Sequence, residues 1–188
     1  MCGRYSLDAD IDELINRYKA IIRHRESYNK KEVFPTDIQP ILINNASKNT
    51  EIIFAKWGFS PSFAKQPIIN ARAETINEKP LFRKAFLTSR CLIPVTSFFE
   101  WEKVENKKIK RKILIESEKV FSLAGIIDQE GAFSIITTCA NPQLEKIHDR
   151  MPVIIEKEYE EFWINDANTD EKTLISLLVP YKYPFIIE

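Results

Sequence analysis

Glycine and histidine are scarce in this sequence. There are four glycines in 188 residues, where average usage would give roughly 13. Neither G-x-G-x-x-G nor G-x-x-x-x-G-K-[ST] occurs, so the common phosphate-binding loops are excluded. The two histidines and the widely spaced Cys2, Cys91 and Cys139 cannot supply the paired ligands of a structural zinc site. We therefore expect neither a metal nor another cofactor.

Long apolar runs are also missing. No stretch approaches the 18 residues of a membrane span, and no apolar segment follows the first residues as in a signal peptide. Three unpaired cysteines fit a reducing compartment better than a disulfide framework. We expect a cytoplasmic monomer with no membrane partner, associated with the nucleoid if it is bacterial. The length suits a single domain over residues 1–188.

The charges cancel, with 27 Lys+Arg and 27 Asp+Glu. They are unevenly placed: residues 1–112 carry 21 basic against 13 acidic side chains, and residues 155–188 carry three against eight. A neutral total therefore does not exclude nucleic acid, because a local positive groove is what matters. The basic stretch Lys103–Lys112 is either part of such a groove or only a solvated hairpin tip.

The pattern of apolar residues predicts a mostly β fold with a few helices. Residues 8–22 have apolar side chains at helical spacing and acidic residues in the first turns, which predicts an amphipathic helix. Shorter helices are predicted for residues 79–88, 159–164 and 170–178. Short β-rich runs separated by polar or proline-containing turns predict antiparallel strands at residues 41–43, 51–57, 91–95, 98–101, 112–116, 120–127, 132–138 and 153–155. We expect one α+β domain with a curved, barrel-like, mainly antiparallel β core and peripheral helices.

Cys2 is the first candidate for chemistry. Removal of Met1 by an aminopeptidase would leave Cys2 with both a free α-amine and a thiol. The reference pKa of an α-amine is about 7.7–8.0, so part of it is neutral at physiological pH and can attack an aldehyde as a Schiff-base nucleophile. The neighbouring thiol can then close a five-membered thiazolidine. The alternative is an ordinary residue near the end of the chain.

Glu100 and His148 are candidates for proton transfer. Glu100 lies in the aromatic run Phe98–Trp101, where apolar surroundings would raise the pKa of a carboxyl group. The alternative is simple strand alternation. Histidine titrates near neutral pH, and Asp149 or Arg150 could orient His148 or bind an anion. The alternative for His148 is a surface or capping residue, and this applies more strongly to His24.

Two further segments carry polar or aromatic side chains suited to binding. Asn70 could hold an amine through its carbonyl oxygen, and Arg72 offers a planar fork that fits phosphate. These residues could equally close a loop upon itself. The segment from Trp57 to residue 67 also carries Phe59 and Phe63. They are either an aromatic platform for unpaired bases or side chains that tuck the loop onto the core.

Taken together and in order, these motifs resemble one known family. The shared segments span about residues 1–155, while residues 156–188 diverge. In this sequence they read MCGRY, PT, WG, INARAET, RC, FFEW and HDRMP, at residues 1–5, 35–36, 57–58, 69–75, 90–91, 98–101 and 148–152. The combination is similar to the SRAP (SOS response-associated peptidase) family of abasic-site processing proteins.

The resemblance implies a DNA-damage function. Family members bind single-stranded DNA carrying an abasic site and join their N-terminal cysteine to the sugar aldehyde as a stable thiazolidine, which shields the lesion. By position, Cys2 is the nucleophile, Asn70 positions its amine, Glu100 assists proton transfer and His148 acts on the sugar oxygen. An autopeptidase activity could remove residues ahead of the cysteine. Alternatives are an N-terminal-nucleophile thiol peptidase or amidohydrolase, and a non-catalytic module that binds single-stranded DNA.

The resemblance also implies DNA contacts. Arg4, Arg72 and Arg150 would hold flanking phosphates, Trp57 would line the DNA channel and Phe63 would stack on bases. The sequence departs from the family pattern in three places. Glu32 replaces an asparagine, Phe63 replaces a second tryptophan, and the usual C-terminal segment is absent.

Overall fold

The computed structural model describes residues 2–188. Met1, whose removal is predicted above, lies outside the described residues. The described chain is mostly β structure. Its strands are β1 Tyr5–Ser6, β2 Ile21–Ile22, β3 Ile38–Asn44, β4 Thr50–Lys56, β5 Asn70–Arg72, β6 Arg90–Val95, β7 Ser97–Val104, β8 Lys107–Leu114, β9 Phe121–Ile127, β10 Phe133–Cys139, β11 Arg150–Pro152, β12 Ile154–Ile155 and β13 Ile186–Ile187. The helices are α1 Ile11–Tyr18, α2 Pro80–Thr88, α3 Glu160–Ile164 and α4 Glu171–Ser176, with short 3-10 turns η1 Ala73–Thr75 and η2 Lys157–Tyr159.

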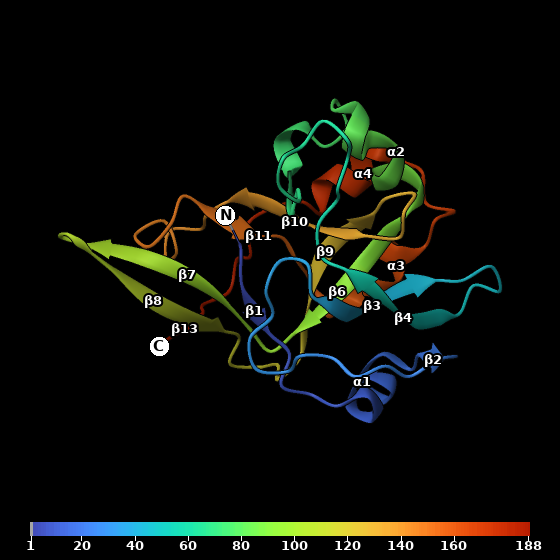
Figure 1. Ribbon diagram of the computed structural model, residues 1–188, viewed down its shortest axis with the longest axis horizontal. Helices are drawn as coiled ribbons and strands as arrows, with labels where there is room; N and C mark the ends of the chain where they lie inside the picture. The colour runs from blue at the N-terminus through green and yellow to red at the C-terminus, as the bar shows by residue number, and fades with distance from the viewer. Residues whose placement is uncertain (1) are drawn as a thin grey trace.

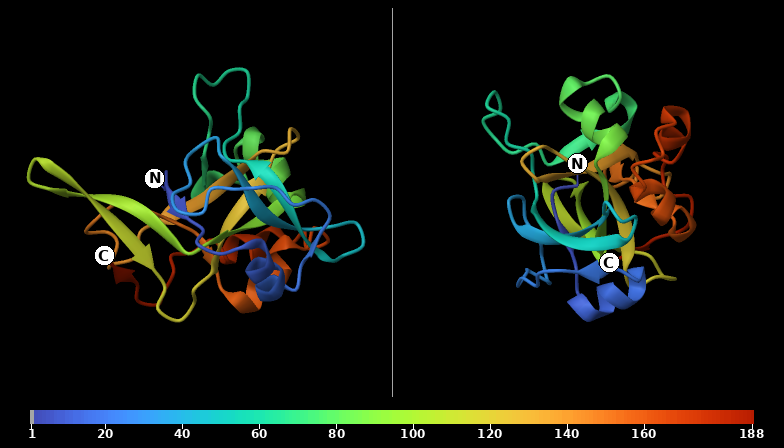
Figure 2. Two further views of the ribbon diagram at one scale, coloured as in Figure 1. Left: turned by 60° about the horizontal axis from the view of Figure 1, so that its bottom comes forward. Right: turned by 90° about the vertical axis from the view of Figure 1, so that its right-hand side faces the viewer.

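The strands form two curled sheets (Figure 1). The smaller sheet has the order β1-β7-β8-β13, and its β7–β8 hairpin extends away from the body of the molecule (Figures 1 and 2). The larger sheet has the order β11-β10-β9-β6-β3-β4-β2, with β12 paired to β9 and β5 paired to β10. The predicted α+β fold with a curved, mainly antiparallel core and peripheral helices is confirmed. The sheets curl without closing into a barrel.

Two apolar clusters hold these layers together. One joins the larger sheet to the helices and includes the buried Leu14, Phe86 and Trp163. The other is contributed by strands of both sheets and includes Tyr5 and Trp57. Burial of large apolar side chains is the main stabilising contribution to such a core. Strand β1 belongs to the second cluster, so the start of the chain is fixed against the core.

The first helix is shorter than the apolar spacing predicts. It begins after Asp10, which forms a capping box with Glu13, and it ends at Lys19, whose φ of 50° is left-handed. Ile21 and Ile22 then pair in parallel with strand β4. The prediction of a helix to Ile22 was therefore wrong, because apolar residues at helical spacing also suit a strand edge that packs on the same core.

The strand predicted at residues 112–116 also required correction. Strand β8 begins at Lys107 and ends at Leu114, so the basic stretch is itself a strand paired with β7. Its lysines alternate with isoleucine and arginine, a period-two pattern that the strong charge obscured. The remaining predicted helices and strands agree closely with those observed.

Buried Arg90 attaches the C-terminal helices to the larger sheet. Its guanidinium donates hydrogen bonds of 2.6–2.9 Å to five backbone carbonyls, those of Phe86, Leu87, Trp163, Asn165 and Asn168. Burial lowers the pKa of Arg90 to about 10, so the side chain stays charged at neutral pH. Among residues 2–188, no helix has the length and apolar composition needed to cross a membrane.

Candidate functional site

Strand pairing places Cys2 beside Glu100. Strand β1 pairs with β7 through Tyr5 and Phe98, and the Phe99 amide donates to the carbonyl of Arg4 at 3.0 Å. Continuing this antiparallel register by one residue beyond Arg4 and Phe99 places Gly3, which follows Cys2, opposite Glu100. Cys2 is fully buried. Burial, reinforced by the negative charge of Glu100, raises the pKa of its thiol, which is therefore protonated at neutral pH.

Glu100 is poised to exchange a proton near neutral pH. Only 3% of the residue is exposed. Burial, followed by the charge of Asp149, raises the pKa of Glu100 from 4.5 to about 7. A carboxyl group with this pKa exists in both protonation states at pH 7, so it can donate or accept a proton in one reaction cycle.

Asn70 joins this cluster from the larger sheet. Strand β5 runs parallel to β10 with Asn70 opposite Ile135, and the Asn70 amide nitrogen donates to the Cys2 carbonyl at 3.0 Å. Its amide oxygen Oδ1 is buried and accepts no hydrogen bond from any group of residues 2–188. Buried polar atoms normally have partners. The unoccupied acceptor therefore identifies a place for a donor next to the Cys2 backbone.

His148 precedes β11, which pairs with residues 137–139 of β10, directly after the residues 135–137 that pair with β5. Its Nδ1 accepts the backbone N–H of Arg150 at 3.0 Å and lies 2.9 Å from Oδ1 of the exposed Asp149. Because a backbone N–H can only donate, Nδ1 is the acceptor in the neutral ring. Burial lowers the pKa of His148, so the neutral form dominates at pH 7.

The structure thus brings the four predicted chemical residues to one locality. Asn70 is hydrogen-bonded to Cys2, the charge of Glu100 acts on the Cys2 thiol, and Asp149, the neighbour of His148, acts on Glu100. In Figure 1 strand β1 lies against β7, with which it pairs. Three separate segments of the chain therefore converge on Cys2.

The three predicted phosphate-binding arginines differ in availability. Arg150 makes a two-pronged ion pair with Glu74 at 2.6 and 2.9 Å and also donates to the Thr137 carbonyl. Arg4 binds Glu32 at 3.1 Å. Arg72 is exposed and has no ion-pair partner within residues 2–188. Thus only Arg72 presents an unneutralised guanidinium.

The predicted aromatic residues separate into core and surface. Trp57 is fully buried. Its ring is tilted against that of Tyr5 and stacked on that of Phe133, and its indole N–H donates to the Ile69 carbonyl at 3.0 Å. Phe63 is 75% exposed. It lies on the loop of residues 58–67 that projects from the body in Figure 2.

Gly58 sets the direction of this loop. Its φ of +117° is accessible to glycine alone among common residues, and a Cβ there would lie 2.8 Å from Cβ of Pro67. A larger residue would force the two ends of the loop apart. The loop geometry that presents Phe63 therefore depends on one of the few glycines in the chain.

Sequence reasoning did not predict which groups the carboxylates near the site would act on. Asp149 influences Glu100, while Glu74 and Glu32 neutralise Arg150 and Arg4. Asp149 and Glu74 lie within the motif segments, so their proximity to the candidate residues was the available signal. Their pairing could not be read from spacing, because Glu74 and Arg150 are 76 residues apart.

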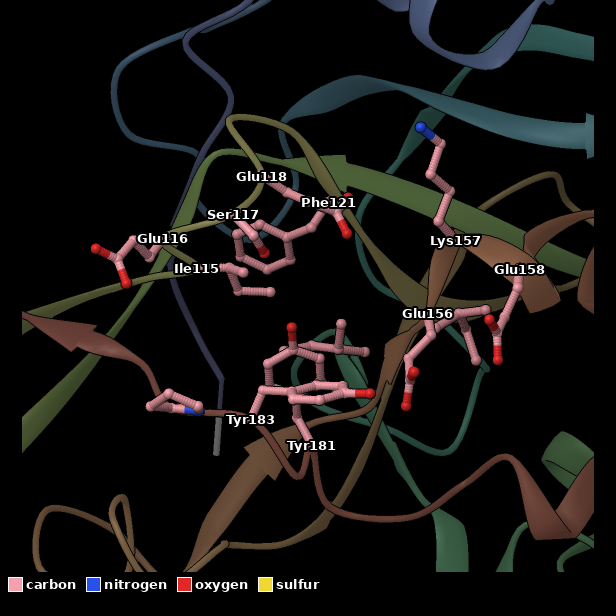
Figure 3. Close-up of a pocket in the computed structure, with 13 residues that line it drawn as sticks. Ile115, Glu116, Ser117, Glu118, Phe121, Glu156, Lys157, Glu158, Tyr181 and Tyr183 are labelled. Atoms are coloured by element: carbon pink, nitrogen blue, oxygen red, sulfur yellow. The ribbon is translucent and has the colours of Figure 1, made fainter.

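Another hollow of the molecule has an acidic lining. It has a volume of about 610 Å³ and lies between the segment 115–121 and the segment 181–184, with Tyr181 and Tyr183 at its centre (Figure 3). Its charged lining is Glu116, Glu118, Glu156, Lys157 and Glu158. Such a surface repels phosphate. Within the described residues 2–188, no three His, Cys, Asp or Glu side chains gather in a way that could hold a metal ion.

Comparisons with known proteins show which chains and structures are similar to this one. The chain is 39% identical over 197 residues to the abasic site processing protein YoqW of Bacillus subtilis, covering 96% of this chain and 88% of that protein. It is 37% identical over 200 residues to YoaM of the same organism, also called an abasic site processing protein, covering 96% and 86%. A crystal structure of a Bacteroides thetaiotaomicron protein superposes with a TM-score of 0.86 at 29% identity, covering 99% of this chain and 90% of the other.

A more distant relative and a family model also match this chain. The Escherichia coli abasic site processing protein YedK is 24% identical over 176 residues, covering 87% of this chain and 79% of that protein. The model of the SOS response associated peptidase family matches residues 1–186. That match spans both sheets and every segment that meets at Cys2. The chain belongs to the SOS response associated peptidase (SRAP) family.

Proposed function

We propose that this protein processes abasic sites in DNA by forming a covalent thiazolidine between Cys2, freed of Met1, and the aldehyde of the ring-opened sugar. Curated relatives named abasic site processing proteins support the DNA lesion as substrate. The observation that carries the chemistry is Asn70. Its amide nitrogen holds the Cys2 carbonyl while its buried oxygen has an unfilled acceptor position.

The Cys2 amine attacks before the thiol. The raised pKa of the thiol keeps it protonated and weakly nucleophilic, whereas an α-amine is partly neutral at pH 7. The amine adds to the aldehyde carbon, the carbinolamine loses one water molecule, and an iminium results. The sulfur then adds to the same carbon and gives up its proton. One water is released in total.

Glu100 supplies and removes protons in this sequence. In its protonated form it donates to the departing hydroxyl of the carbinolamine. The resulting carboxylate then accepts the thiol proton as the ring closes, and the pKa of about 7 suits both transfers. Neutral His148 serves the sugar oxygen during ring opening, because Nδ1 accepts from Arg150 and the N–H at Nε2 can therefore donate to that oxygen.

The protonated thiol also bears on the thiol-peptidase alternative. Thiol peptidases need a thiolate, which a positive neighbour stabilises. Among the charges that act on the Cys2 thiol, the carboxylate of Glu100 has the largest effect, and it raises the thiol pKa further. The environment of Cys2 favours aldehyde capture over attack by a free thiolate.

The exposure of each candidate side chain decides which DNA contacts we assign to it. We assign the phosphate contact first to Arg72 and base stacking to Phe63, because both side chains are exposed. Arg4 and Arg150 reach phosphate only by exchanging their carboxylate partners. The role proposed for Trp57 changes from lining the DNA channel to supporting it from within the core, because its indole is buried.

The test of this function is adduct formation. Protein whose intact mass shows loss of Met1 is incubated with a single-stranded oligonucleotide bearing one abasic site, then run on a denaturing gel after heating. We expect a heat-stable band of the combined mass. An oligonucleotide reduced with borohydride, which lacks the aldehyde, is the control. Absence of the band with the aldehyde substrate contradicts the proposal.

Glu100→Gln is expected to slow adduct formation by about 10²–10⁴-fold, because a general acid–base group contributes about that factor. It should also change the pH dependence of stability. Between pH 4.5 and about 7 the folded wild type holds a proton that the unfolded chain has released, so its stability falls as pH rises through this window. The shift corresponds to about 3 kcal/mol.

Urea unfolding at pH 5 and pH 8 measures this effect. Between pH 5 and pH 8 the wild type should lose up to about 3 kcal/mol of its free energy of unfolding. The glutamine variant should lose less. The exposed Glu145→Gln serves as a control that leaves the wild-type profile unchanged. Identical pH profiles for Glu100→Gln and wild type would show that Glu100 is not the neutral buried carboxyl we describe.

Phe63→Ala is expected to weaken binding of single-stranded DNA without affecting folding. Stacking of one base on an aromatic ring contributes about 1–3 kcal/mol, equivalent to roughly 5–150-fold in affinity. Fluorescence anisotropy with an undamaged oligonucleotide measures the loss, and thermal unfolding should be unaltered because the ring is 75% exposed. An unchanged affinity would remove Phe63 from the DNA surface.

A further inference from the structure

The β7–β8 hairpin carries an unusual concentration of lysine on one face. Directly opposite residues of an antiparallel ladder share a face, and the register pairs Phe99 with Lys112, Trp101 with Lys110, and Lys103 with Lys108. We call these six residues the cationic face. The Lys110 ammonium lies 4.1 Å from the centre of the Phe99 ring, which confirms their common side. The hairpin extends away from the body in Figure 1 and in the left view of Figure 2.

The outer end of this face is electrostatically unfavourable within the fold. Lys103 and Lys108 lie directly opposite each other, and like charges in that position destabilise a sheet. Both are exposed, and neither has an ion-pair partner within the described part of the chain. The protein alone supplies no compensation for the repulsion, whereas a polyanion lying along the face would.

The inner end of the cationic face adjoins the candidate site through Arg4. The Arg4 guanidinium lies 4.0 Å from the ring centre of Phe34 and 5.3 Å from that of Trp101. Arg4 is two residues from Cys2, whose sulfur is 3.9 Å from the Arg4 carbonyl oxygen. Positive charge and aromatic rings therefore continue from the neighbourhood of Cys2 onto the hairpin.

The length of the face matches several phosphates. From Phe99, beside Arg4, to Lys103 the strand advances four residues, or about 14 Å at roughly 3.4 Å per residue. The phosphates of one strand of B-DNA are spaced by about 3.4 Å along the helix axis. Lysines alternating along a strand can therefore contact more than one phosphate of a nucleic-acid backbone.

Glu32 occupies the middle of this path. Its carboxylate binds Arg4 at 3.1 Å and also binds Lys110. The hydrogen bond from Lys110 is the main cause that lowers the pKa of Glu32, so the group is ionised at neutral pH. An anionic carboxylate that joins the two cations marks the position that a phosphate would take.

We infer that the cationic face of the hairpin binds the phosphate backbone of DNA flanking the lesion, with Glu32 as an internal competitor. The inference rests on the proposed function, which supplies DNA as the polyanion. Binding there is sequence-independent and salt-dependent, because it is carried by ammonium groups and phosphates. The hairpin thus extends the DNA surface beyond the segments that meet at Cys2.

The test measures non-covalent binding, so it does not depend on adduct formation. Each variant is made in Cys2→Ala protein, and affinity for undamaged oligonucleotides is followed by fluorescence anisotropy from low to moderate salt. K103Q/K108Q should reduce the slope of log K against log salt by about 1.4 on single-stranded DNA and about 1.8 on duplex. The two DNA forms show which backbone the hairpin prefers.

The matched control removes the same charge elsewhere. Lys157 and Lys172 are exposed and lie in the acidic C-terminal part of the chain, so K157Q/K172Q should leave the slope unchanged. Glu32→Gln should have the opposite effect to the hairpin variant, with tighter binding and a steeper slope, because it releases Arg4 and Lys110. Thermal unfolding checks that all variants are folded.

Equal slopes for K103Q/K108Q and the control on both DNA forms would overturn the inference. That outcome is separable from failure of the proposed function. A wild-type protein that forms the abasic adduct while the hairpin variant keeps its slope retains its function and loses the hairpin contact. A reduced slope without any adduct supports the hairpin contact and contradicts the chemistry at Cys2.

Discussion

Cys2→Ala is expected to abolish the heat-stable adduct with abasic DNA altogether. Alanine keeps the α-amine but lacks the thiol, so capture stops at the Schiff base, which hydrolyses on heating. Cys2→Ser should behave in the same way without borohydride and give a trapped adduct with it. The readout is the fraction of oligonucleotide shifted on a denaturing gel, with and without borohydride.

The separation between imine and thiazolidine makes this experiment decisive. Cys139→Ala is the matched control, because Cys139 is an exposed thiol and should contribute nothing. A heat-stable adduct from Cys2→Ala would move the nucleophile elsewhere. Adduct formation by wild type should also slow below neutral pH, since protonation removes the amine nucleophile. A rate unchanged down to about pH 5 would argue against an amine.

Arg90→Ala is expected to cost more than about 4 kcal/mol in the free energy of unfolding. Five backbone carbonyls would lose a charged donor inside the core, and each buried unsatisfied polar group costs about 1–3 kcal/mol. The loss corresponds to a fall in melting temperature of roughly 8–16 °C for a domain of this size. Urea and thermal unfolding measure it.

The planar shape of the guanidinium is as important as its charge. Arg90→Lys keeps one positive charge but cannot direct donors to five separated carbonyls, so it should recover only part of the stability. Arg83→Ala is the control. Arg83 lies on helix α2, its side chain is 55% exposed, and it is 3.8 Å from Glu171. Its removal should therefore cost less than about 1 kcal/mol in the free energy of unfolding. Equal effects of Arg83→Ala and Arg90→Ala would contradict this account.

Local sequence patterns predicted most of the elements but not how they end. The helix that starts at Asp10 was expected to reach Ile22, yet it stops at Lys19 and the following isoleucines join a sheet. Acidic residues indicated a start at Asp8, and the helix begins at Ile11 after the Asp10 cap. Its end depends on a parallel partner in β4, about 30 residues later, which periodicity cannot reveal.

The four residues of the candidate site lie in one locality of the fold. The resemblance to the SRAP family implied this grouping of Cys2, Asn70, Glu100 and His148, and the role of each stays a prediction. The sequence did not show which of the neighbouring arginines are paired with carboxylates. Whether an arginine is available to phosphate depends on a tertiary partner, as for Arg150 and its distant ion-pair residue.

Burial similarly decides the role of an aromatic residue. Aromatic character alone does not show which of Trp57, at the end of the predicted strand 51–57, and Phe63, in the loop that follows, faces solvent. Packing against Tyr5 removes the first from the surface, and the geometry at Gly58 leaves the second exposed. The contribution of Arg90 was also hidden, because its five acceptors are backbone atoms that any sequence possesses.

The two outer strands of the smaller sheet, β1 and β13, impose an order in time on synthesis of the protein. They come from opposite ends of the described chain, so this sheet is incomplete until Ile187 has been added. At about 5–20 residues per second, a chain of 188 residues takes roughly 10–40 s to make. On the proposal that Met1 is removed to free Cys2, we expect the cleavage to precede folding, because the folded protein buries Cys2.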